Sequence, residues 1–278
     1  MPKISTFKKQ PVTLIISVYK DTENLSCILN ALSFQTHCVD EIIVSEDGND
    51  SRMSEFISQV KPFWPNIIHL SQKDNGFRKN QALNKAISIS KNELLIFIDG
   101  DCVPHKEFIS AHVKNCKPGV ASVGRRAEPG PIFSSLIKKY KWFLRVIQNK
   151  WIYLSLLIPM TLDKGKNIEA GFYSPFLHKR NANKKIGLLG CNFALYKEDI
   201  LKINGFNEDY IYPGIGEDSD IEWRLNQVGV NSINIKFIAT EYHLYHKTKY
   251  VPSHENLNIF KTIQDKKIVF CKNGIIKD

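Results

Sequence analysis

Hydrophobic positions in the first 100 residues follow two alternating periods. Residues 12–19 (VTLIISVY) form a continuous apolar run rich in β-branched side chains, which predicts a buried strand. Apolar side chains then recur at i, i+3, i+4 and i+7 from Leu25 to Leu32, which predicts a helix. The alternation continues with a strand in EIIVSEDG, a strand over residues 66–70, a helix over residues 80–89 and a strand in LLIFIDGD.

The pattern changes at residue 132 and becomes regular again at residue 186. Residues 132–185 mix Lys and Arg with Trp, Phe, Tyr and Leu. Residues 186–196 (IGLLGCNFALY) and 233–239 (INIKFIA) each predict a strand. Between them, DIEWRLNQVG predicts a helix that ends at Gly229.

Strands that alternate with helices need crossover connections, so the chain is predicted to be an α/β protein with a mostly parallel central sheet. Ligands of such sheets bind beyond the carboxyl ends of the strands. Tyr19, Asp47, Asp99 and Asp101 lie at the carboxyl ends of predicted strands. These four residues are therefore expected on one rim of the sheet.

Two interpretations are open for residues 132–185. Basic and aromatic side chains are typical of helices that rest on a membrane surface, and the net charge of +10 agrees with an anionic partner. A helical insertion that packs its apolar face on the core and leaves its lysines in water explains the same pattern. The two interpretations can hold together. The longest apolar run, residues 151–160, is too short to span a bilayer as a helix.

Cysteine usage and the N-terminal segment bear on the compartment. The six cysteines form no CxxC pair and show no Cys/His ligand spacing, which favours reduced thiols in a cytoplasmic protein. The first ten residues, MPKISTFKKQ, lack the apolar segment of a signal peptide. A secreted or integral membrane protein is therefore not expected.

The pair Asp99 and Asp101, separated by Gly100, is the first candidate for site chemistry. Mg²⁺ and Mn²⁺ commonly bind through one or two carboxylates together with substrate phosphates. Two acids at a strand end, with a glycine that allows close backbone approach, suit a metal clamped to a diphosphate. A short acidic turn that faces water is the alternative for this motif.

Three further elements carry candidate site residues. Glu217 and Asp218 precede a helix, where one of the local acids can cap free N–H groups and another can act as a general base. His243 and His246 follow a strand and offer imidazoles to a metal. Arg78, in DNGFRKN, is either a partner of phosphates or a solvated surface charge.

Taken in order, these motifs resemble family 2 glycosyltransferases of the GT-A fold. The resemblance rests on SVYKDTENL, SEDG, KDNGFRKNQALNKAI, FIDGDCVPHKEFISAH, GCNFALYKEDILKINGFNEDY, GEDSDIEWRL and HLYH. The last three resemble the C-terminal region shared by β-1,4-galactosyltransferases and chondroitin-polymerase-type enzymes. The resemblance runs from about Val12 to His246 and implies a Rossmann-like sheet flanked by helices.

For the donor, the resemblance implies a UDP-sugar bound together with Mn²⁺ or Mg²⁺. Asp99 and Asp101 match the DxD motif, whose last aspartate binds the metal on the diphosphate. Asp47 matches the acid that contacts uracil, and Tyr19 lies where the base or ribose docks. Arg78 is the candidate partner of the phosphates.

For the reaction, the resemblance implies a single displacement that inverts the anomeric centre. Asp218 matches the catalytic base, and Glu217 matches the neighbour that contacts the acceptor or the sugar. His246, and less closely His243, match the histidine that completes metal binding.

One departure from the family pattern concerns the acceptor platform. The related enzymes have Gly-Trp-Gly before the acidic pair, whereas this chain has Gly-Ile-Gly at residues 214–216. The indole that packs against the sugar is therefore missing, and Tyr212 is a candidate replacement.

The expected organisation is one catalytic domain, residues 1–250, followed by a tail, residues 251–278. Residues 11–105 are expected to form its nucleotide-binding half and residues 106–250 its acceptor-binding half. The acceptor-binding half carries the insertion, at about residues 132–185.

The predicted function is transfer of a hexose or N-acetylhexosamine from a UDP-sugar to a hydroxyl of a cell-surface glycan, such as lipopolysaccharide or capsule. Peripheral contact with an anionic membrane on its cytoplasmic side would bring the enzyme to a lipid-linked acceptor, and nucleic acid is not an expected partner. A phosphatase of the haloacid dehalogenase type with Asp99 as nucleophile is one alternative. A basic module without enzymatic activity that docks on anionic lipid is the other.

Overall fold

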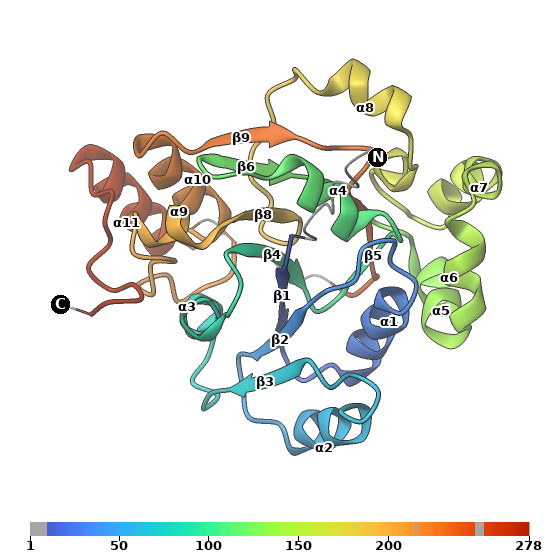
Figure 1. Cartoon of the computed structure of the whole chain (residues 1–278), viewed down its shortest axis with the longest axis horizontal. Helices are drawn as coiled ribbons and strands as arrows, with labels where there is room; N and C mark the ends of the chain where they lie inside the picture. The colour runs from blue at the N-terminus through green and yellow to red at the C-terminus, as the bar shows by residue number, and fades with distance from the viewer. Residues whose placement is uncertain (1–9, 215, 248–252, 278) are drawn as a thin grey trace, which may run out of the picture.

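The computed structural model of the chain describes residues 10–214, 216–247 and 253–277. A seven-stranded sheet forms the centre, with helices on both of its faces, and a three-stranded sheet lies beside it (Figure 1). The strand order of the large sheet is β3-β2-β1-β4-β8-β6-β9, and only β8 runs antiparallel to its neighbours. The predicted α/β class with a mostly parallel sheet is therefore confirmed.

The first half of the chain alternates strands and helices as predicted. Each of the four predicted strands and both predicted helices is found, with β-branched runs in the centre of the sheet. Helix α2 was not predicted, because only Met53 and Ile57 of its ten residues are buried. The elements are β1 (Val12–Val18), α1 (Thr22–Leu32), β2 (Glu41–Glu46), α2 (Ser51–Val60), β3 (Ile67–Ser71), α3 (Lys79–Ile89) and β4 (Leu94–Asp99).

The second half adds short strands and most of the helices. The small sheet has the order β5-β10-β7, so it joins segments that are far apart in the sequence. The elements are β5 (Cys102–Pro104), α4 (Phe108–Asn115), β6 (Val120–Val123), β7 (Arg125–Ala127), α5 (Pro131–Lys139), α6 (Lys141–Ile147), α7 (Lys150–Leu162), η1 (Ile168–Gly171), α8 (Pro175–Asn181), β8 (Phe193–Tyr196), α9 (Lys197–Leu201), α10 (Asp218–Gln227), β9 (Asn231–Asn234), β10 (Thr240–His243) and α11 (His254–Asp265).

Two predicted strands are shorter in the structure. The segment 186–196 contributes only β8, because a turn in which the N–H of Asn192 donates to the carbonyl of Leu189 precedes the strand. The segment 233–239 stops being extended after Asn234. Phe237 has φ +73°, and the N–H of Ala239 donates back to the carbonyl of Ile235 at 3.0 Å. The apolar side chains of this segment are therefore buried in a turn and do not form a continuous strand.

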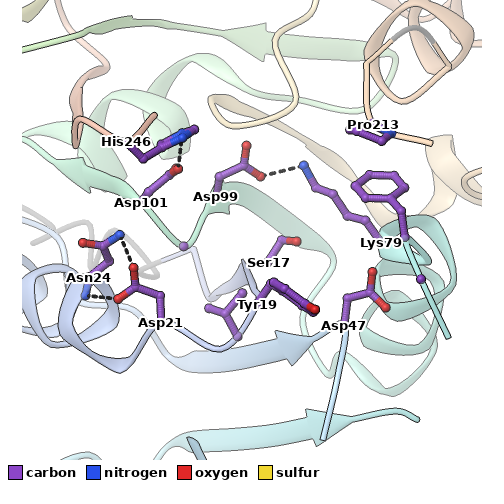
Figure 2. A pocket seen from close by; sticks show the side chains of 14 residues that line it. Ser17, Tyr19, Asp21, Asn24, Asp47, Lys79, Asp99, Asp101, Pro213 and His246 are labelled. Carbon is purple, nitrogen blue, oxygen red and sulfur yellow. Dashed lines mark hydrogen bonds and ion pairs between the residues drawn. The ribbon is translucent and has the colours of Figure 1, made fainter. Parts of the chain in front are cut away.

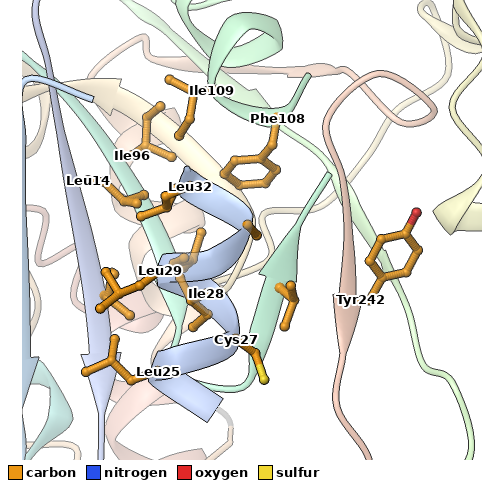
Figure 3. Close-up of a cluster of buried hydrophobic side chains, with 14 of the residues drawn as sticks. Leu14, Leu25, Cys27, Ile28, Leu29, Leu32, Ile96, Phe108, Ile109 and Tyr242 are labelled. Atoms are coloured by element: carbon orange, nitrogen blue, oxygen red, sulfur yellow. The ribbon is translucent and has the colours of Figure 1, made fainter. Parts of the chain in front are cut away.

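Each face of the large sheet carries its own apolar core. On one face, the predicted stripe of α1 packs with Leu14 and Ile96 of the sheet and with Phe108 of α4 (Figure 3). On the other face, α3 and α10 pack with residues such as Phe97. Truncating a fully buried residue such as Ile28 of α1 to Ala is expected to cost about 2–5 kcal/mol.

The insertion forms a lobe of helices at one side of the molecule (Figure 1). Its inward side chains are buried, and the hydroxyl of Tyr153 donates to the carbonyl of Ile168 at 2.7 Å. Helices α5 and α6 contact α1. The packing interpretation of the insertion is therefore confirmed. Among the described helices, none has both the length and the apolar character needed to cross a membrane.

The segment 253–277, expected as a tail, packs on the body of the protein. The Asn256 side chain of α11 donates to the carbonyl of Tyr212 at 2.8 Å, and the N–H of Ile275 donates to the carbonyl of Asn204 at 3.0 Å. Cys271 is buried beside α9. The Asn256 contact therefore holds the segment before α10, and the other two hold the turn after α9.

Candidate active site

The carboxyl ends of β1, β2 and β4 meet at one edge of the large sheet. A cavity of about 630 Å³ lies at this edge (Figure 2). Five of the predicted site residues line it, namely Tyr19, Asp47, Asp99, Asp101 and His246. The remaining lining residues are Ser17, Val18, Asp21, Asn24, Gly76, Phe77, Lys79, Gly100 and Pro213.

Gly100 allows the DGD turn to lie against β1. Its N–H donates to the carbonyl of Ser17 at 2.6 Å, and a Cβ at this position would lie only 2.9 Å from the same oxygen. Any side chain at residue 100 would therefore push the turn away from β1. The expected close backbone approach at this glycine is found.

Asp47 is held at the end of β2 by two donors. Its carboxylate accepts from the backbone N–H of Arg78 at 2.6 Å and from the Gln72 amide at 2.8 Å. Arg78 is not one of the lining residues of the cavity, and its guanidinium donates to the carbonyl of Phe77. The structure therefore places the backbone of Arg78 under Asp47 and the side chain of its neighbour Lys79 in the cavity.

Tyr19 stands at the mouth of the cavity with 55% of its surface exposed. Its hydroxyl donates to Asp74 at 3.1 Å, and the same carboxylate pairs with Lys20 at 2.6 Å. The ring is thus held at its polar end, and the Lys20 Nζ lies over one of its faces, 4.7 Å from the ring centroid. An aromatic face in this position can stack on a flat ring such as a nucleobase.

Lys79 connects the two acidic motifs. Its Nζ lies 2.7 Å from Asp99 and 2.9 Å from Glu217, with only 15% of the lysine side chain exposed. Burial acts to lower the pKa of Lys79, but the charges of Asp99 and Glu217 outweigh it and raise this pKa well above its usual range. Lys79 is therefore a permanent cation between β4 and α10.

Asp218 and Glu217 face a second cavity of about 320 Å³ that shares Lys79 and Asp99 with the first. Burial raises the pKa of Asp218, while the charge of Lys79 acts in the opposite direction. The pKa of Glu217 is raised by burial in the same way. A carboxylate with a raised pKa is a better proton acceptor than a solvated one, which is the property of a general base.

The acid that serves a structural role at α10 is Asp220. It pairs with the fully buried Arg224 one turn later, and the guanidinium also donates to the carbonyls of Ile203 and Gly205. Neither Glu217 nor Asp218 caps the helix through its side chain. The ion pair with Arg224 therefore occupies Asp220, whereas Glu217 and Asp218 line the cavity.

Gly190 makes room for Asp218. A Cβ at residue 190 would collide with the Asp218 carboxylate, and the φ angle of this residue does not require a glycine.

Arg126, which no sequence pattern indicated, lines the same cavity as Asp218. Its guanidinium lies 3.3 Å from the sulfur of Cys191 and 3.5 Å from Glu128.

Asp101, His243 and His246 form a group that could hold a metal ion. The Nε2 atoms of both histidines lie 3.3 Å from one oxygen of Asp101, and the three ligand atoms are within 4.8 Å of one another. Burial acts to raise the pKa of Asp101, but the two histidines outweigh it and hold this pKa far below its usual range. A carboxylate with two imidazoles, open to the cavity through His246, fits a divalent first-row metal.

Asp99 is not part of this metal-ligating group, since its carboxylate is paired with Lys79. The sequence had placed both aspartates of the DxD motif on the donor. The structure brings Asp101 together with the histidines and Asp99 together with the acidic pair before α10.

The structure describes Gly214 and Gly216 of the Gly-Ile-Gly turn, but Ile215 lies outside the described residues. Gly214 and Gly216 have φ +105° and +115°, and a Cβ at Gly216 would collide with the ring of Tyr210. Tyr212 is 42% exposed but lines neither cavity. Pro213 is the residue of this turn that lines the larger cavity.

Comparisons with known proteins agree with this geometry. The model of glycosyl transferase family 2 matches residues 13–202, and that of the N-terminal domain of galactosyltransferase matches residues 174–247. Among curated proteins, glycosyltransferase AglE of Haloferax volcanii is 31% identical over 42% of this chain and 39% of its own length. Hyaluronan synthase of Pasteurella multocida is 30% identical over 32% of this chain and 9% of its own length. The chain thus matches well under half of either relative.

Two solved structures share the fold. The mannosyltransferase PcManGT from Pyrobaculum calidifontis, in complex with GDP-Man and Mn²⁺, aligns with a TM-score of 0.57 over 87% of this chain and 59% of its own, at 16% identity. GalNAc-T7 with UDP, GalNAc and Mn²⁺ aligns with a TM-score of 0.62 over 93% of this chain and 48% of its own, at 13% identity. The predicted GT-A architecture is confirmed by these alignments.

Proposed function

Because the chain belongs to glycosyl transferase family 2, we propose that it transfers a hexose or N-acetylhexosamine from a UDP-sugar to an acceptor hydroxyl, with inversion and with a divalent metal. One observation carries the proposal. A group of candidate metal ligands and a partly buried candidate base, Asp218, face two adjoining cavities that share Lys79 and Asp99. The transfer needs a bound diphosphate and a proton acceptor side by side, and this arrangement supplies both.

The larger cavity is the proposed donor site. Its volume of about 630 Å³ is in the range that holds a small ligand. Tyr19 offers a ring face for the base, and Asp47 offers carboxylate oxygens to a base N–H. The backbone of Arg78 and the side chain of Gln72 keep Asp47 in place. We assign the donor to UDP because of the match to the galactosyltransferase domain over residues 174–247.

Asp101, His243 and His246 are the proposed holders of the metal. Two imidazoles beside one carboxylate favour Mn²⁺ over Mg²⁺, which prefers oxygen ligands alone. When bound, the metal supplies positive charge that offsets the negative charge developing on the leaving diphosphate. Asp101 and the histidines fix where that charge is placed.

Asp218 is the proposed catalytic base, and Glu217 positions the acceptor or the sugar. Asp218 would take the proton of the acceptor hydroxyl as its oxygen attacks the anomeric carbon. Lys79 holds Glu217 and Asp99 in place through its two ion pairs. A single displacement of this kind needs no covalent enzyme intermediate and inverts the anomeric configuration.

The proposal is tested by incubating the full chain with Mn²⁺ and a panel of UDP-sugars, with and without simple sugar acceptors. We expect release of UDP, and proton NMR of the product is expected to show the opposite anomeric configuration. Asp218→Asn should abolish transfer while leaving UDP binding intact. Release of inorganic phosphate without UDP would instead support the phosphatase alternative with Asp99 as nucleophile.

We further propose that the acceptor is a lipid-linked cell-surface glycan and that α5 to α7 rest on the anionic, cytoplasmic face of a membrane. Large apolar side chains on this lobe are exposed, with Trp142 at 61%, Trp151 at 69%, Ile158 at 74% and Leu162 at 81%. Seven cations accompany them within residues 131–166, namely Lys138, Lys139, Lys141, Arg145, Lys150, Lys164 and Lys166.

One acidic side chain outside this segment, Glu23 of α1, lies 3.5 Å from Lys138. The only one within residues 131–166 is Asp163, which is buried and accepts from the N–H groups of Ile132 and Phe133 at the start of α5. Each Lys or Arg near an anionic surface contributes about 1 kcal/mol to binding. Aromatic side chains beside these cations suit the interfacial region.

Co-sedimentation with vesicles tests the membrane contact separately from catalysis. We expect the chain to sediment with phosphatidylglycerol-containing vesicles and not with pure phosphatidylcholine vesicles, and the double variant W142A/W151A to remain in the supernatant. Phe270→Ala is the matched control, since Phe270 is 49% exposed in the C-terminal segment at the far side of the molecule (Figure 1). Equal sedimentation of all three proteins would overturn this assignment.

A further inference from the structure

A second group of metal-ligating side chains lies beside Asp101. Cys102 at the start of β5, Cys191 before β8 and Glu241 in β10 have ligand atoms within 4.8 Å of one another. All three side chains are buried, with at most 1% of the residue exposed. The sequence showed no ligand spacing because these residues come from segments that only the fold brings together.

The small sheet and one amide fix this group. Cys102 lies opposite His243 in the antiparallel pair of β5 and β10, and Glu241 is two residues before His243, so it projects to the same face. Asn192 ties the Cys191 turn to the sheet, because its amide donates to the carbonyls of Arg125 and Ala239, each at 3.1 Å. The three ligand atoms are therefore held by backbone that has little freedom to move.

Glu241 is the observation that calls for a ligand. Both oxygens of its carboxylate are buried, and neither has a hydrogen-bond partner among the described residues. A buried carboxylate without donors is unfavourable, and native proteins satisfy nearly all such groups with a proton donor, water or an ion. Thiols are weak donors, so the two cysteines do not replace these partners.

We propose that Cys102, Cys191 and Glu241 bind a zinc ion. Thiolates select zinc over Mn²⁺ and Mg²⁺, which prefer oxygen ligands. Two thiolates and one carboxylate carry three negative charges. Zinc supplies two positive charges and Arg126, 3.3 Å from the sulfur of Cys191, supplies the third, so the charges of these three ligands are balanced.

Asp101 connects this zinc site to the proposed catalytic metal site. One of its oxygens faces the two histidines, while the other lies 3.6 Å from the sulfur of Cys102. Two ligands of a tetrahedral zinc, one sulfur and one oxygen, are about 3.6 Å apart when their bonds to the metal are about 2.3 and 2.1 Å. The distance between Asp101 and Cys102 therefore matches that of a sulfur and an oxygen ligand, and the Asp101 carboxylate links the proposed zinc site to the histidines.

Cobalt substitution tests the proposal in a way that does not depend on activity. Thiolate ligands give Co²⁺ an intense charge-transfer absorption in the near ultraviolet, which carboxylate and imidazole ligands do not. The full chain, stripped with a chelator under reducing conditions and titrated with Co²⁺, is expected to develop this absorption with a stoichiometry of one. Addition of Zn²⁺ is expected to remove it.

Variants locate the site. Cys102→Ser and Cys191→Ser are expected to lose the absorption, whereas Cys116→Ser, a buried thiol beside Val120, and His246→Ala are expected to keep it. Glu241→Gln should weaken zinc binding by more than the roughly 10- to 100-fold that loss of an outer-shell partner costs. A wild-type protein that binds Co²⁺ without the charge-transfer absorption would overturn the proposal.

Alkylation of the cysteine thiols tests the proposal even if the serine variants do not fold. With zinc bound, two of the six thiols of the folded wild-type chain are expected to resist alkylation more strongly than without zinc, and peptide mapping should identify them as Cys102 and Cys191. If denatured protein purified without reductant has only four free thiols because these two are joined as a disulfide, the zinc assignment is wrong.

Discussion

Replacing Lys79 with Met removes the cation that pairs with both Asp99 and Glu217 and keeps most of the volume of the side chain. The lysine Nζ lies 2.7 Å from Asp99 and 2.9 Å from Glu217, and its charge also lowers the pKa of Asp218. An opposite charge near a carboxyl group lowers its pKa by about 1–3 units, so removing the Lys79 charge from the cavity that it shares with Asp218 is expected to raise the pKa of Asp218 by up to this amount. Each unit by which the pKa of the base exceeds the assay pH reduces its ionised fraction about tenfold.

The direction in which the pH–rate profile should move follows from the proposed role of Asp218 as a base. Activity rises with pH as a base loses its proton, so the rising limb of the pH–rate profile of Lys79→Met is expected about 1–3 units above that of the wild type. The folded protein is also expected to lose about 3–5 kcal/mol if the carboxylates stay ionised, and less if they take up protons. UDP release from the donor sugar, measured at saturating donor across the pH range, gives the profile.

Two controls separate charge from structure. Lys79→Arg keeps the cation and is expected to keep the position of the rising limb. Lys91→Met removes an exposed lysine at the opposite end of β4 and should change neither the profile nor the stability. A Lys79→Met protein with lower activity at all pH values and an unshifted rising limb would refute the reasoning, because the cation would then act on packing alone.

Three further predictions concern stability and the second cavity. Burial lowers the pKa of both His105 and His112 to about 3, so the unfolded state binds more protons below pH 6.5 and unfolding by urea should become easier by about 1.4 kcal/mol per pH unit for each histidine. His112→Gln should reduce that slope, and an unchanged slope would contradict the assignment. Gly190→Ala is expected to lower transfer more than 100-fold without loss of UDP binding, because the methyl group collides with Asp218, and near-normal turnover would contradict this. Arg224→Met, which leaves the buried Asp220 without its partner, should cost about 3–5 kcal/mol in chemical denaturation, and a loss below 1 kcal/mol would show that the pair is dispensable.

The sequence predicted the rim of the sheet well because the relevant information is local. A strand pattern that runs into Asp47 or Asp99 places the acid at the carboxyl end of that strand, and parallel strands bring these ends to one edge. The prediction of α1 also used local information, because the spacing of its apolar residues lies within one helix. The strand predicted over residues 233–239 is too long because burial in a turn, with Phe237 at φ +73°, gives the same apolar pattern as a strand.

What the sequence could not predict depends on contacts between distant segments. Lys79 and Glu217 are 138 residues apart, and nothing in either neighbourhood indicates that they form an ion pair. The roles of Asp99 and Asp101 also diverge only in three dimensions, where one carboxylate meets Lys79 and the other meets two histidines. The grouping of Cys102 with Cys191 has the same origin, since strand pairing and the Asn192 amide create it.

Calorimetric titration of UDP into the metal-free chain, with and without Mn²⁺, tests most directly whether Asp101 and the histidines hold a metal against a nucleotide diphosphate. We expect Mn²⁺ to tighten UDP binding about tenfold or more in the wild type and to have no such effect in Asp101→Ala, whose fold is checked by circular dichroism. Equal UDP affinity with and without Mn²⁺ in the wild type, or an intact Mn²⁺ effect in Asp101→Ala, would contradict it.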